Sequence, residues 1–139
     1  MYPRVCLTKA GMEYAGRSGD GWLSHLLPVT LNSDGAADVL TAARISGGLF
    51  IRTGMTADRS MATDTAANLL AMLSEMDVGD TYVFRVVVTT AFALTITGGT
   101  GVTVSRGVVP VFTSATGVGG GKFFLLTKTG AATCTVDGI

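Results

Sequence analysis

Residues that could support catalysis are few and scattered in this 139-residue chain. It has one histidine, His25, so any arrangement of a nucleophile, a histidine and a carboxylate would have to include it. The neighbouring Ser24 is poorly placed as a nucleophile, because side chains next to each other along a chain seldom face each other. We therefore predict that the protein is not an enzyme and that His25 is a surface or interface residue.

Metal and phosphate chemistry also lack the required spacings. No pair of histidines or cysteines has ligand spacing, and Asp77 and Asp80 are expected to close a glycine turn rather than to hold an ion. The tract 117–122 looks like a phosphate loop, but its glycine spacing is wrong and Phe123 stands where a Ser or Thr would bind magnesium. We expect this tract to be a loop, or a segment that gains order only against a neighbouring subunit. No cofactor is predicted.

Acidic residues are equally uninformative about catalysis. Glu13 and Glu75 are the only glutamates, and the aspartates cluster at turns and at the start of the expected helix. A glycosidase needs two carboxyl groups facing each other across a cleft. No aspartate or glutamate lies on an inward strand face of the expected sheet, which disfavours polysaccharide cleavage.

Low charge is the main compositional feature. Charged residues make up 14% of the chain, against roughly 25% in ordinary soluble domains. A surface of Thr, Gly, Ala and Ser with so few charges favours an oligomer that hides much of it in subunit contacts. The net charge is zero and the basic residues are scattered singly, which disfavours nucleic-acid binding.

Membrane insertion and secretion are disfavoured as well. The densest apolar stretch, 82–88, is interrupted by Arg85 and is far shorter than the roughly 20 residues of a membrane-spanning helix. The first residues lack the apolar segment of a signal peptide. Cys6 and Cys134 lie at opposite ends of the chain, and we expect two free thiols in a reducing cytosol rather than a disulfide.

The first 42 residues differ in character from the rest. Glycines interrupt short apolar patches, and no regular period persists, so we predict an extended N-terminal arm over 1–42. The arm contains one compact apolar cluster, which ends at Pro28 and is the candidate partner-binding site: Trp22, Leu23, Leu26 and Leu27. Such a cluster needs a surface to cover it, either on a partner or, equally, on its own domain.

Residues 43–139 are predicted to form a β domain. Ser46 and two following glycines suggest a bulge or bend in a strand, and one helix of about eleven residues is expected after an N-cap at Thr63 or Asp64. Its apolar face would contain Leu69, Met72, Leu73 and Met76. A helix this short must pack on a sheet or close a barrel end, because it would be marginal in isolation.

Short strands with glycine turns follow. The segment 82–88 is apolar on nearly both faces and should be a central strand, whereas Pro110 places 108–112 at an edge or a bulge. Further strands are expected near 92–97, 102–104, 123–126 and 133–136. The predicted fold is mainly β, a small antiparallel barrel or jelly-roll-like sandwich with one short helix.

Several motifs between 49 and 104 resemble a C-terminal module of tailed-phage virion proteins. The matching pattern contains TDTAANLL with Thr65 and Leu69, then VGDTYVFRV, then ALTITGGTGVTV ending at Thr103 and Val104. The resemblance implies a trimeric β-barrel or jelly-roll-like domain of a capsid decoration, or cement, protein. The arm lies outside the matching residues.

The function implied is that of a structural virion protein made in the host cytoplasm. As a homotrimer on the outside of the phage head, it would stabilise contacts between subunits of the major capsid protein. In this hypothesis the arm contacts the shell and the β domain holds the trimer. The alternative is a host-recognition or fibre-tip module whose exposed loops bind a glycan or receptor.

Overall fold

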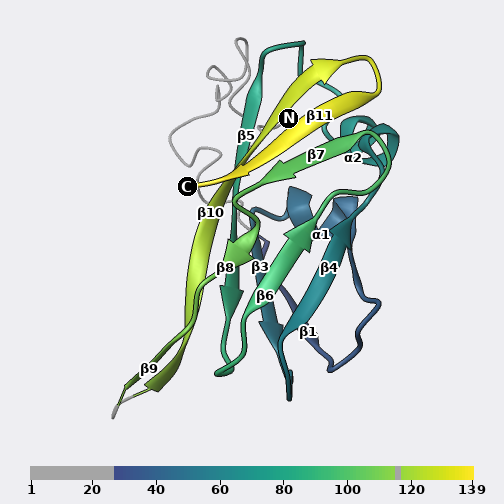
Figure 1. Cartoon of the computed structure of the whole chain (residues 1–139). Coiled ribbons are helices and arrows are strands. Elements are labelled where there is room, and N and C mark those ends of the chain that lie inside the picture. The colour runs from purple at the N-terminus through teal and green to yellow at the C-terminus, as the bar shows by residue number, and fades with distance from the viewer. Residues whose placement is uncertain (1–26, 115–116) are drawn as a thin grey trace.

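The structure is a computed structural model, and it describes residues 27–114 and 117–139. Two β-sheets pack face to face around one apolar core, and two short helices lie over one end of the sandwich (Figure 1). The predicted mainly β sandwich is confirmed.

The larger sheet has the strand order β1-β3-β5-β10-β11-β7, with β9 paired to β10. Its strands are β1 (Val29–Asn32), β3 (Leu49–Thr53), β5 (Thr81–Val88), β7 (Val102–Ser105), β9 (Phe112–Ser114), β10 (Gly117–Gly130) and β11 (Thr133–Gly138). The smaller sheet has the order β2-β4-β6-β8, formed by β2 (Val39–Leu40), β4 (Arg59–Thr63), β6 (Leu94–Thr97) and β8 (Val108–Val109).

Strand direction differs from the antiparallel arrangement predicted. The pairs β1-β3, β3-β5, β2-β4, β4-β6 and β7-β11 are parallel, whereas β5-β10, β10-β11, β9-β10 and β6-β8 are antiparallel. The reason is the path of the chain, which alternates between the sheets from β1 to β8. Successive strands of one sheet are therefore joined by a crossover through the other, and such connections allow parallel pairing.

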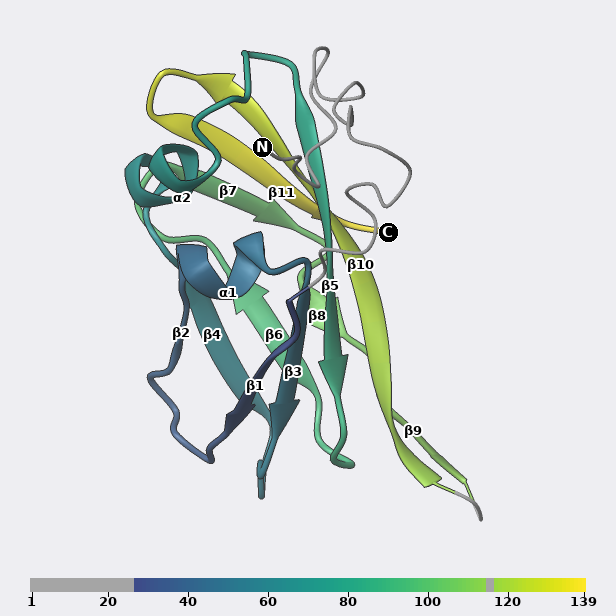
Figure 2. The same ribbon diagram turned by 180° about the vertical axis from the view of Figure 1, so that it is seen from behind.

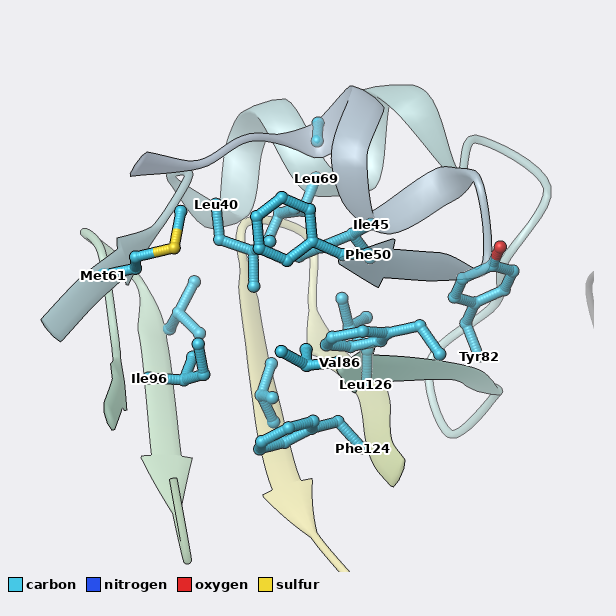
Figure 3. Close-up of a cluster of buried hydrophobic side chains, with 14 of the residues drawn as sticks. Leu40, Ile45, Phe50, Met61, Leu69, Tyr82, Val86, Ile96, Phe124 and Leu126 are labelled. Carbon is cyan, nitrogen blue, oxygen red and sulfur yellow. The ribbon is translucent and has the colours of Figure 1, made fainter. Parts of the chain in front are cut away.

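The central strand was predicted correctly. Strand β5 lies between β3 and β10 and buries every second residue, including Phe84 and Val86. The rings of Phe84 and Phe124 stack across β5 and β10 with centroids 5.5 Å apart. Side chains from both sheets and both helices meet in this core (Figure 3). Tyr82 is buried at its edge, where its hydroxyl donates to the Ser46 carbonyl oxygen (2.8 Å).

Residues 27–114 and 117–139 contain two helices where one was predicted. Helix α1 (Ala42–Ser46) replaces the strand bend expected near residue 46, and Gly48, with φ 84°, turns the chain from this helix into β3. Helix α2 (Ala66–Met72) is shorter than predicted. Met72, predicted on the apolar face, is half-exposed and lines a surface hollow with Asn68, because α2 turns its Ala66, Leu69 and Leu70 side to the core.

Asp64 joins the two helices at their N-termini. One carboxylate oxygen accepts from the Ala42 N–H (3.1 Å), and the other accepts from the Thr65 N–H (2.9 Å) and the Asn68 side-chain amide (2.7 Å). The N-cap of α2 is Thr65 and not the predicted Thr63 or Asp64. The Asn68 hydrogen bond is the largest cause that lowers the pKa of Asp64, followed by that of Ala42.

A network of charged residues fixes the loop between β1 and β2. Arg52 is completely buried, and its guanidinium pairs with Asp38 (3.0 Å) and donates to the carbonyl oxygens of Ser33 (3.1 Å) and Gly35 (3.0 Å). Burial lowers the pKa of Arg52, and the nearby Asp38 carboxylate opposes that effect. These contacts attach the loop to the large sheet.

The range predicted to be an arm, 1–42, includes two strands of the sandwich. Val29–Asn32 pairs with β3 and Val39–Leu40 pairs with β4, and Leu40 is completely buried in the core. Any separate N-terminal segment therefore ends before Val29. Residues 1–26 lie outside the described part of the chain.

The glycine tract after residue 116 is not the loop that was predicted. It forms the first part of β10, where 117–119 pair with β9 and 120–121 pair with the end of β5. A Cβ at Gly120 would collide with the Pro110 carbonyl oxygen. Glycine is required there because the chain between β8 and β9 crosses β10 at close range.

Candidate interaction surface

The predicted partner-binding residues are only partly within the described chain. Trp22, Leu23, Leu26 and His25 lie outside it, so their placement is untested. Leu27 is described: its side chain is 68% exposed, and its N–H donates to the Gly47 carbonyl oxygen (2.9 Å). The chain thus enters the sandwich beside the start of β3.

A hairpin formed by β9 and the start of β10 projects from one end of the sandwich (Figures 1 and 2). Phe112 is 69% exposed and lies opposite Gly119, whereas Val118 is 48% exposed and lies opposite Thr113. Side chains of neighbouring residues in a strand point to opposite faces. The projecting hairpin therefore exposes an apolar side chain on each face.

A shallow groove of about 460 Å³ lies between the hairpin and the end of β5. Residues 117 and 119–121 are glycines that line it, together with Phe112, Val87 and Arg85. A Cβ at Gly121 would lie 2.8 Å from Nη2 of Arg85, so the glycine leaves room for that guanidinium. An aromatic ring, a backbone floor and one cation make this groove suited to a protein segment.

The outer face of the large sheet continues this apolar surface. We use "outer face" for the outward side chains of β3, β5 and β10 around Arg85: Leu49, Val83, Phe123 and Leu125. Leu49 and Phe123 flank Arg85 in one row, and Leu125 pairs with Val83 in the next. Phe123 is 48% exposed, and the Arg85 guanidinium lies 5.3 Å from its ring centroid. The outer face is therefore an apolar patch around the Arg85 guanidinium.

Two partly exposed acidic side chains, Asp34 and Asp137, have structural contacts. Asp34 pairs with Arg59 (2.9 Å), and this contact, with hydrogen bonds from Thr56, holds the pKa of Asp34 far below its ordinary value. Asp137 accepts from Ser105 and pairs with Arg106; the Ser105 hydrogen bond is the largest cause that lowers its pKa. These contacts fix loops and an exposed sheet edge.

The turn after α2 closes as predicted. Asp80 accepts from the Asp77 N–H through its carboxylate (2.8 Å), and its own N–H donates to the Asp77 carbonyl oxygen (2.9 Å). Within residues 27–114 and 117–139, no group of three or more His, Cys, Asp or Glu side chains could hold a metal ion. The same residues contain no helix with the length and apolarity needed to cross a membrane.

Cys134 is buried in β11, and burial raises the pKa of its thiol. Cys6, the other cysteine, is outside the described residues. Cys134 therefore behaves as a small core residue, because a buried thiol with a raised pKa is a poor nucleophile.

Sequence reasoning missed the hairpin and the outer face. Phe112 was assigned to an edge strand with no role, and Arg85 only to the break in an apolar run. One signal was available: Phe123 and Phe124 are adjacent, so one of the two rings had to point away from the core of any sheet that contained them. No family model, curated protein or solved structure matches the chain.

Proposed function

We propose that this protein is a non-enzymatic structural component of a tailed-phage virion, a capsid decoration protein that binds the outside of the head as a homotrimer. The observation that carries the proposal is the projecting hairpin with Phe112 and Val118 exposed on its two faces. Exposed apolar side chains on a protruding element mark sites of protein association. The resemblance of 49–104 to virion modules gives the association its biological setting.

The hairpin and the adjacent groove support a ring-shaped assembly. In a contact where the hairpin of one copy enters the groove of the next, the two surfaces differ, and such contacts form closed rings when the rotation between copies closes. Phe112 of one copy would then lie on the glycine floor of its neighbour. Few charges need to be removed from water in this contact, since Arg85 is the one charged side chain among the described residues that line the groove.

The N-terminal residues before Val29 are the proposed contact with the major capsid protein. They precede the first strand, so they can reach a second protein without disturbing the sandwich. A trimer that binds several capsid subunits through three such segments gains affinity from multivalency and links those subunits. This linkage is how the protein would stabilise the shell.

Two measurements test the proposal. Light scattering at micromolar concentration should give the mass of a trimer, and a monomer would refute it. In co-sedimentation with capsids, the full chain should bind and a chain lacking residues 1–26 should not. This deletion leaves Leu40 and both N-terminal strands intact, whereas deletion to residue 40 would remove them. Binding by the truncated chain would assign the shell contact to the sandwich.

A host-recognition or fibre-tip module is the second candidate. The groove favours it, because an aromatic wall at Phe112 above a backbone floor is also suited to a sugar ring. The two functions differ in what fills the groove. If Phe112 is protected from solvent in the trimer, the groove is an interface; if it stays accessible and Phe112→Ala abolishes cell binding, recognition is favoured.

A further inference from the structure

The outer face continues beyond β10 onto β11 and β7, which lie side by side in the same sheet (Figures 1 and 2). Residues in register on neighbouring strands point to the same side of a sheet. Asp137 is therefore beside Leu125, and Ser105 follows it on β7. The Ile139 N–H donates to the Phe123 carbonyl oxygen (3.0 Å), so this row gains an apolar side chain that is 63% exposed. We use "sheet face" for the outward side of β3, β5, β10, β11 and β7.

Charged side chains are nearly absent from the sheet face. Among the outward residues of its five strands, Arg85 is the one cation and Asp137 is the one carboxylate. Its centre is apolar, with Phe123 and Leu125 on β10, and a row of hydroxyl side chains in register borders this centre: Thr81, Thr127, Thr135 and Thr103. A sheet that faces water usually presents polar residues to it, whereas an apolar centre with few charges and a polar rim is typical of protein interfaces.

The two charges of the sheet face do not pair within one chain. Arg85 and Asp137 lie two strands and one row apart, and strands about 4.8 Å apart with rows about 7 Å apart put about 12 Å between their positions. The Arg85 guanidinium lies over the Phe123 ring, and none of the described carboxylates pairs with it. Asp137 is 34% exposed and accepts from Ser105 and Arg106. A carboxylate offers about four acceptor sites, so Asp137 can accept from a second guanidinium.

A second copy that faces the first across a two-fold axis brings these charges together. In such a contact the same surface is used twice, so residue i of one copy meets residue j of the other and the reverse. An axis in the plane of the contact, equidistant from Arg85 and Asp137, places Arg85 of each copy over Asp137 of the other. This axis crosses β10 between Phe123 and Leu125, so the apolar residues form the centre of the contact.

The area of the sheet face fits a specific but weak contact. Its five strands span about 24 Å, and the three rows from Arg85 to the threonines span about 20 Å, so each copy offers about 480 Å². Two copies would bury about 1,000 Å², which is the lower limit for specific protein interfaces. We therefore expect association at concentrations above micromolar rather than a permanent dimer.

We propose that the sheet face binds the sheet face of a second copy across a two-fold axis on β10. Reciprocal ion pairs between Arg85 and Asp137 flank an apolar centre of Phe123 and Leu125. The inference does not rest on the proposed function, because it needs neither the hairpin nor a capsid. Where copies also associate through their hairpins, the sheet face joins one trimer to the next.

Sedimentation equilibrium of the full chain up to millimolar concentration tests the contact. The mass should double as the concentration rises, from monomer to dimer or from trimer to hexamer. Phe123→Ser should raise the dissociation constant of this doubling step at least tenfold, with far-UV circular dichroism unchanged. Val78→Ser, at a residue 64% exposed in the turn after α2, is the control and should change nothing. A mass that never doubles, or a doubling that Phe123→Ser leaves intact, would overturn the inference.

The same measurement separates the sheet face from the hairpin. Phe112→Ser should change only the step that triples the mass, because Phe112 lies on β9 and outside the sheet face. Loss of the tripling step alone would leave the sheet-face contact supported. Absence of the tripling step in the wild type would refute the trimer and not the two-fold contact.

Charge-reversal variants test the ion pairs. Arg85→Asp and Asp137→Arg should each weaken the doubling step at least tenfold, because each places like charges opposite each other. An equimolar mixture of the two variants should restore doubling, since every contact between unlike copies then contains two pairs of opposite charge. A mixture that stays as dissociated as each variant alone would overturn the pairing.

Milder variants keep the test valid if Asp137→Arg fails to fold after losing its Ser105 and Arg106 contacts. Arg85→Gln and Asp137→Asn should each weaken the doubling step, and the double variant should be no weaker than either alone. Additive losses would overturn the pairing, because they would show that the two side chains act independently.

Discussion

Replacement of Phe112 by serine should weaken the proposed trimer and leave the fold unchanged. An aromatic side chain offers about 200 Å² for burial, and Phe112 is 69% exposed, so an interface can cover up to about 140 Å² of it. At about 25 cal/mol per Å², this area contributes up to about 3.5 kcal/mol at each contact between copies. Loss of most of it would weaken each contact about 100-fold or more.

Sedimentation equilibrium over a range of concentrations measures this loss directly. Phe112→Ser should dissociate at far higher concentrations than the wild type, and its circular dichroism should be unchanged because the ring contributes little to the core. Val78→Ser, which removes a similarly exposed side chain far from the hairpin, is the matched control. Equal dissociation of Phe112→Ser and the wild type would refute a role for the hairpin in association.

Three predictions concern the fold. Phe124→Ala should lower the free energy of unfolding by about 3–5 kcal/mol, because the ring is completely buried. Phe123→Ala in the same strand should lower it much less, because that ring is half-exposed. Equal losses of stability in urea unfolding would contradict the assigned faces. Gly120→Ala should lower the free energy of unfolding by about 1–3 kcal/mol, since its Cβ would strike a backbone carbonyl oxygen. The control Gly117→Ala has nothing within 4 Å of the added Cβ and should leave the stability in the same assay nearly unchanged. The pKa of Asp64 is lowered from 3.8 in the folded chain, so its contribution to stability is present above about pH 4 and is lost as the pH falls through the lower folded value. Melting temperatures measured from pH 7 downward should therefore decline less steeply below about pH 4 in Asp64→Asn, and an unchanged acid decline would contradict the helix-bridging role.

Local patterns predicted several elements correctly. The apolar alternation in 82–88 identified β5 and its central place: every second residue lies in the core, and the outward residues are only partly covered. Pro110 predicted an edge, and β8 before it is the edge of the smaller sheet. The aspartates at 77 and 80 predicted a turn that their own hydrogen bonds close.

The candidate surface was less accessible to sequence reasoning. Phe112 occurs in an apolar run, and nothing local distinguishes a core ring from one on a projecting hairpin. Its exposure follows from the length of β10, which extends beyond the end of β5 and takes β9 with it. The Trp22 cluster was predicted from composition, and most of it lies outside the described residues.

The class of the protein could be predicted from its residues alone: a low-charge, mainly β domain with alternating strands, glycine turns and a short capped helix. Those features depend on the preferences of single residues and on the side-chain period along one segment. Three features could be seen only in the folded chain: the parallel pairing of β1, β3 and β5, the inclusion of the glycine tract in β10, and the exposed faces. Strand pairing depends on backbone hydrogen bonds between distant segments, and every residue except proline offers the same backbone donor and acceptor, so local sequence carries little information about it.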